Sequence, residues 1–144
     1  MKNLTRLFWV SSTLIATFSI YVFAEENKKN KLQIIMQNLL QDTQNILEGM
    51  ILEDYKLIYE SADRIASHPT PGIAIQVKLL KNMGGDLSTF KNLDGYVHDR
   101  AIAVREASKI MDKEQIFSEY TKLLNGCLSC HTQYKTKVSN IINK

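Results

Sequence analysis

The stretch that decides the fold is Lys113–Ile142, which reads KEQIFSEYTKLLNGCLSCHTQYKTKVSNII. Its apolar side chains return every three or four residues, which is the period of a helix with one buried face. The residues predicted to share that face are Phe117, Tyr120, Leu124, Cys127, His131, Val138 and Ile142. The stretch therefore predicts one long amphipathic helix, and it carries both cysteines of the sequence.

Three more segments upstream have the same period, and none alternates with a period of two. We expect helices over about 28–48, 52–67 and 86–111, and a shorter helical piece over about 73–83. Gly49 would end the first helix, the prolines of 68–72 would end the second, and Gly84 with Gly85 would form a turn after the short piece. Four long amphipathic segments with short connections predict an all-α fold, an antiparallel up-down-up-down four-helix bundle.

The composition is that of a single globular domain. The chain has 144 residues, of which 44% are hydrophobic and 23% charged. It is too short for a two-domain nucleotide-binding enzyme, and two prolines and six glycines are too few for a loop-rich all-β fold. The net charge of +3 falls to +1 when Lys2 and Arg6 are set aside. This nearly neutral body offers no basic surface for nucleic acid.

The first 24 residues have the layout of a secretory signal peptide. A short basic start is followed by an uncharged apolar run, and Val22 and Ala24 place short side chains before Glu25. We expect cleavage after Ala24, which leaves 25–144 as one exported domain, in the periplasm of a bacterium. The alternative is an uncleaved membrane anchor, because the apolar run is close to the minimum length that spans a bilayer.

The segment Cys127-Leu128-Ser129-Cys130-His131 has the pattern C-x-x-C-H. Two thiols three residues apart on a helix lie on the same side, near the separation of the two vinyl groups of a haem. Each thiol can add to one vinyl group to give a thioether, and the adjacent imidazole can bind the iron. The pattern therefore predicts one covalently bound haem c, with His131 as the proximal ligand.

Other interpretations of the pattern fit less well. A zinc site needs four ligands, and only His68 and His98 remain to complete one. A redox dithiol usually follows a strand, a disulfide would strain a continuous helix, and two buried cysteines beside a chance histidine carry no chemistry.

With this motif in its last helix, the chain resembles the class II c-type cytochromes, the cytochrome c′ family. The stretch Ile35-Met36-Gln37-Asn38-Leu39-Leu40 resembles the first-helix segment in which Met-ligated, low-spin members carry their sixth ligand. Lys135 stands where members usually have a basic residue. Leu32 replaces an arginine that is often found before the distal position. The resemblance also implies the possibility of a homodimer formed through the first two helices.

The sixth iron position could be filled by Met36, His68 or His98, or could stay empty. In an up-down-up-down bundle the start of the first helix lies level with the end of the last one. Met36 lies about 12 Å into the first predicted segment, and His131 lies about 16 Å from the end of the last. This similar depth, and the place of Met36 on the predicted inward stripe, favour Met36. His68 lies near an edge of the bundle, and His98 is rotated off the apolar stripe.

A methionine at the sixth position favours an electron carrier that is not an enzyme and that exchanges single electrons with redox partner proteins. If the position is empty, the chain would instead bind nitric oxide or carbon monoxide. A catalytic haem ranks last, because no acid–base pair or distal arginine is readable near Met36.

Overall fold

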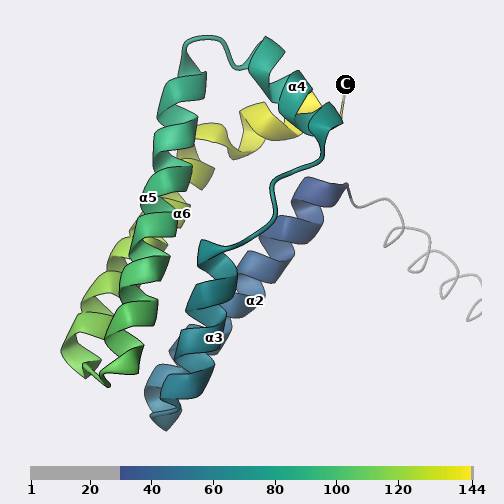
Figure 1. Cartoon of the computed structure of the whole chain (residues 1–144). Helices are drawn as coiled ribbons and strands as arrows, with labels where there is room; N and C mark the ends of the chain where they lie inside the picture. The colour runs from purple at the N-terminus through teal and green to yellow at the C-terminus, as the bar shows by residue number, and fades with distance from the viewer. Residues whose placement is uncertain (1–29, 144) are drawn as a thin grey trace, which may run out of the picture.

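The protein, as a computed structural model, is described over residues 30–143, and all of its regular structure in this range is helical. The elements are α2 (Lys31–Leu52), α3 (Tyr55–Ala66), α4 (Ile73–Asn82), α5 (Asp86–Lys109) and α6 (Lys113–Ile142) (Figure 1). The all-α prediction is confirmed for this range, which holds five helices and no strand. The predicted signal peptide, residues 1–24, lies outside the described residues. None of the helices between residues 30 and 143 has the length and apolar character needed to cross a bilayer.

Side-chain caps decide where three of the helices begin. Asn30 accepts a hydrogen bond from the backbone N–H of Gln33, and the Gln33 side chain accepts one from the backbone of Asn30, each at 3.0 Å. Asp54 and Asp112 accept similar bonds at 2.9 Å from backbone groups three residues ahead of them. Such caps satisfy N–H groups that have no partner inside the helix. They explain why α2 and α3 begin about three residues later than the periodicity predicts.

The prediction that Gly49 ends the first helix is wrong. The helix continues to Leu52, and Glu53 ends it in the left-handed conformation, with φ of 56°. Gly49 is buried where α3 crosses α2, and a Cβ atom there would lie 2.7 Å from Cγ1 of Ile58 and 3.0 Å from the carbonyl oxygen of Asp54. Glycine is therefore needed at this position for the close approach of two helices.

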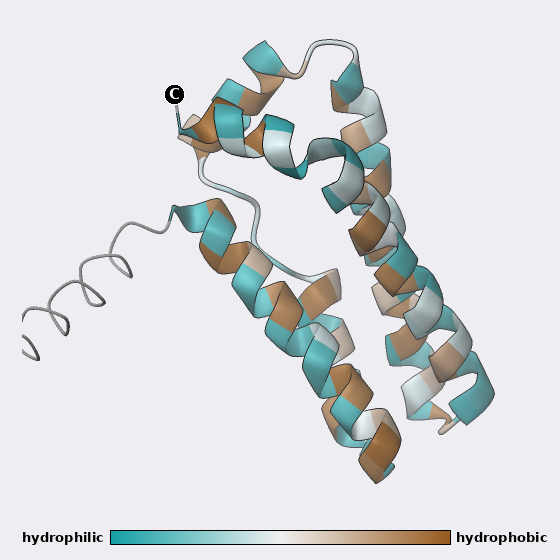
Figure 2. Ribbon diagram, turned by 180° about the vertical axis from the view of Figure 1, so that it is seen from behind, coloured by the Kyte–Doolittle hydropathy of each residue, from teal (hydrophilic) through white to brown (hydrophobic). Residues whose placement is uncertain are grey.

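The buried side chains form two clusters at different heights. Figure 1 shows α2 beside α3 and α5 beside α6, while α4 lies against the C-terminal part of α6. Figure 2 shows hydrophobic and hydrophilic residues following one another in bands along each helix. The main cluster consists of Ile46, Ile58, Ala62, Ile65, Ala101, Val104, Ala107, Ile116, Tyr120 and Leu123. The second cluster consists of Leu79, Met83, Tyr134 and Val138. The short piece predicted at about 73–83 is therefore a helix that helps to build a second core.

Arginine–carboxylate ion pairs join α2 to α3, α3 to α5, and α5 to α6. The contact between α2 and α6 has no such pair among the described residues of the two helices. The ion pairs, each 2.7 Å between nitrogen and oxygen, are Arg64–Asp42 between α2 and α3, Arg105–Asp63 between α3 and α5, and Arg100–Glu119 between α5 and α6. Between α2 and α6, the described residues of the two helices share one hydrogen bond, from the Tyr120 hydroxyl to the Thr43 carbonyl, at 3.1 Å, and Lys113 at the start of α6 forms an ion pair of 2.6 Å with Glu53, which ends α2. The two helices approach each other closely at few points. We call this weakly joined contact the α2–α6 seam.

Gly49→Ala should destabilise the fold, whereas Gly95→Ala should stabilise it. An added methyl group at Gly49 meets Ile58, and such overpacking costs about 1–3 kcal/mol. A Cβ at Gly95, in the middle of α5, meets no atom within 4 Å, so the gain in helix propensity of roughly 0.5–1 kcal/mol is realised there. Urea unfolding followed by circular dichroism measures both free energies of unfolding. Equal shifts in the two variants would contradict the packing described at Gly49.

Candidate functional site

The three residues of the C-x-x-C-H pattern lie on α6 at the level where the two clusters meet. Cys127 is partly buried and packs against the main cluster, while Cys130 is partly buried and packs against the second cluster. Both thiols are free. As predicted for residues three apart on a helix, they share one side of α6, and here this side faces the interior.

Gly126 sets the distance between α5 and α6 beside this pattern. A Cβ atom at Gly126 would lie 2.9 Å from Cγ2 of Val97 and 3.0 Å from Cδ1 of Tyr96. The contact with Val97 is closer than real Cβ atoms show and the one with Tyr96 is tight, so a larger residue at Gly126 would force these side chains to shift. With one side of α6 held against α5, the flank that follows Cys127 around the helix is directed toward α2.

His131 is exposed, and it lies on the side of α6 that also carries Tyr120. It follows Tyr120 by eleven residues, which is about three helical turns, and Tyr120 is the residue that bonds to α2. The prediction that His131 shares the buried face is therefore wrong, and the same holds for Phe117, of which 65% is exposed. The reason is that α2 lies too far from α6 to cover this edge of the predicted stripe.

Met36 lies on the side of α2 that also carries Thr43, two turns later. It stands between Leu32, which packs against the second cluster, and Leu39, which packs against the main one. Its exposed fraction is 38%, so the expectation that it is central on the inward face is wrong. The buried residues of α2 are Ile35, Asp42, Ile46 and Gly49, because α3 packs on that side and the real stripe is rotated toward it.

Both side chains lie on the same side of the one hydrogen bond that joins α2 to α6. Met36 precedes Thr43 by two turns of α2, about 10 Å, and His131 follows Tyr120 by about 16 Å along α6. Contacts of both helices with the second cluster show that these two directions lead the same way. The rise along the two helices therefore places Met36 and His131 within about one turn of the same height.

Burial makes the two thiols poor nucleophiles. Burial raises the pKa of Cys127 above its ordinary value. Burial also raises the pKa of Cys130, with a further contribution from the carboxylate of Asp94. Since the thiolate is the reactive form, neither cysteine has the lowered pKa typical of a catalytic or redox dithiol. Lys135, the basic residue four positions after His131, is exposed.

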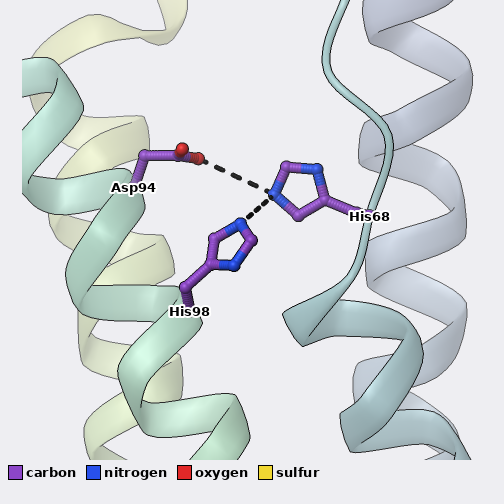
Figure 3. Close-up of side chains that lie close together, drawn as sticks. All are labelled: His68, Asp94 and His98. Carbon is purple, nitrogen blue, oxygen red and sulfur yellow. Dashed lines mark hydrogen bonds and ion pairs between the residues drawn. The ribbon is translucent and has the colours of Figure 1, made fainter.

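The two remaining histidines, His68 and His98, contact each other. His68 lies just after α3 and His98 lies on α5, and their Nε2 atoms are 3.0 Å apart (Figure 3). Asp94 Oδ1 is 3.8 Å from Nε2 of His68. The sequence offers the two histidines as candidates for the sixth iron position or for a zinc site with the cysteines, and it does not predict their contact. The signal that could have joined them is the spacing of four between Asp94 and His98, which puts both on one helix face.

The described residues thus place two partly buried thiols and an exposed imidazole on one helix, α6, and a partly exposed thioether on α2. Such a donor set can hold an iron porphyrin, because thiols anchor its vinyl groups and soft or imidazole donors bind the metal. Comparisons of the chain with protein-family models, with curated proteins and with solved structures give no match.

In the haem-free chain, both thiols should react slowly with iodoacetamide at neutral pH. Their raised pKa values leave little thiolate, so the rates should fall below that of a cysteine in an unstructured peptide and rise toward it at alkaline pH. Cys127→Ser and Cys130→Ser allow each thiol to be followed alone by mass spectrometry. A rate at neutral pH above that of the peptide would contradict the burial described for them.

Proposed function

We propose that the chain is a c-type cytochrome that carries single electrons on one covalently bound haem c. The observation that carries this proposal is the place of Cys127, Cys130 and His131. Cys127 packs against one apolar cluster and Cys130 against the other, and His131 follows directly on the same helix. When bound, the haem supplies an iron atom that cycles between the ferrous and ferric states.

The chain's own residues have distinct tasks in this proposal. Each S–H group of Cys127 and Cys130 would add across one vinyl C=C bond, the sulfur to one carbon and the hydrogen to the other, so the anchor would be permanent. His131 would offer a ring nitrogen to the iron from the same helix, and Met36 would offer its thioether from α2. A thioether favours the ferrous iron and so raises the reduction potential. Apolar side chains around the seam lower the local polarity, which disfavours the additional charge of the ferric state.

The resemblance to class II c-type cytochromes belongs to this proposal. It includes the antiparallel four-helix arrangement of α2, α3, α5 and α6, with α4 as an addition. Export to the periplasm follows from the requirement that haem c is attached outside the cytoplasm. The partners would be redox proteins, and a homodimer could use the apolar residues that α2 exposes. Of these residues, Leu40 is 59% exposed and Leu47 is 46% exposed.

Haem attachment is tested by producing the chain in a bacterium that has the machinery for c-type maturation. The purified chain should be red, should keep its haem on a denaturing gel and should gain the mass of one haem. Cys127→Ser and Cys130→Ser should each weaken attachment, and the double variant should abolish it. Ser129→Ala, an exposed position between the two cysteines, is the matched control and should attach haem normally. Colourless material from the unaltered chain would overturn the proposal.

Met36→Ala should convert a low-spin haem spectrum into a high-spin one that changes at once when carbon monoxide is added. The loss of the thioether leaves the iron without a sixth ligand, and the sulfur–iron band at the red edge of the oxidised spectrum should disappear. Met111→Ala is the control, because Met111 is 63% exposed and lies at the far end of α5. If the unaltered protein is already high-spin and binds carbon monoxide, it is instead the gas-binding form.

A further inference from the structure

We propose that His68, Asp94 and His98 form a binding site for a divalent transition-metal ion of the zinc type. One nitrogen or oxygen atom from each residue lies within 4.8 Å of those of the other two. Figure 3 shows His68 and His98 pointing toward each other, with Asp94 directed toward the same place.

The distances suit coordination of one ion. Around a tetrahedral zinc ion with bonds of about 2.0–2.1 Å, neighbouring ligand atoms are about 3.3 Å apart. Here Nε2 of His68 lies 3.0 Å from Nε2 of His98 and 3.8 Å from Oδ1 of Asp94. Side-chain movements of less than 1 Å at these two contacts would therefore bring the atoms to the spacing that an ion needs.

A backbone hydrogen bond favours the His68 tautomer that binds a metal. Its Nδ1 lies 3.1 Å from the carbonyl oxygen of Pro69. Because a carbonyl can only accept, Nδ1 carries the proton, and the lone pair of Nε2 is directed at His98. Metal-binding histidines usually hold their second nitrogen in this way. His98 can free its own Nε2 by moving its proton to Nδ1.

The residue types decide the kind of ion. Two imidazoles with one carboxylate suit zinc and its neighbours in the transition series, whereas magnesium and calcium prefer oxygen ligands throughout. The Asp94 side chain is 55% exposed, which gives an ion access from solvent. Three protein ligands leave a fourth position for water.

The two thiols are the competing ligands for an added ion, so their positions matter. His68 follows α3, and the other two ligands lie on the flank of α5 that faces α3, as does Arg105 in its ion pair with Asp63. Cys127 and Cys130 belong to α6. An ion held by His68 would fasten the segment after α3 to α5, and it would not need either thiol.

Zinc binding to the full chain tests the site, measured by isothermal titration calorimetry and by the zinc retained after gel filtration. We expect one zinc ion per chain and a rise in melting temperature on adding zinc, since binding to the folded state stabilises it. The Cys127→Ser/Cys130→Ser double variant removes the thiolate donors and should keep this binding. Loss of zinc uptake in that variant, with its helix content intact, would overturn the proposal.

Single variants identify the ligands. His68→Ala and His98→Ala should each weaken binding at least about tenfold, the smallest loss typical even of outer-shell partners. Asp94→Asn should weaken it less. Asp99→Asn is the matched control, because Asp99 is an exposed carboxylate next to His98 on another face of α5. If an alanine variant loses helix content, His98→Gln takes its place. Equal affinity in the His98 and Asp99 variants would overturn the proposal, and neither experiment requires haem.

Discussion

The close approach of α5 and α6 at Gly126 is the constraint on which the rest of the site depends. A larger residue at Gly126 would force the side chains of Tyr96 and Val97 to shift. Because the orientation of a helix is shared by all of its residues, this one contact decides where the next five side chains point. It turns Cys127 and Cys130 toward the two clusters and leaves His131 exposed.

The ion pairs between the described helices also leave the α2–α6 seam the most weakly joined contact. Arginine–carboxylate pairs and buried apolar side chains join α2 to α3, α3 to α5, and α5 to α6. Across the remaining seam, only the Tyr120 hydroxyl reaches the backbone of the opposite helix among the described residues of α2 and α6. A seam held this weakly can adapt to a large apolar group at a lower cost than the other three.

The sequence allowed much of the helical framework to be predicted, because amphipathic periodicity and caps act locally. The last helix matches its prediction at both ends, and the motif lies on it. What could not be predicted depends on how helices pack. Gly49 has the features of a helix end, and only the position of α3 shows that it is a contact. The orientation of Met36 depends on which side of α2 receives α3. The meeting of His68 with His98 requires two elements whose contact no local pattern encodes.

The inward direction of the two thiols also has a consequence for the order of events during biogenesis. An enzyme that modifies both sulfur atoms must reach them from outside, yet each is packed against a cluster that draws on several helices. Docking of α5 against α6 would close that route. Any enzymatic modification of this pair is therefore expected on the newly made, still open polypeptide, with the final packing of the helices following as the later step.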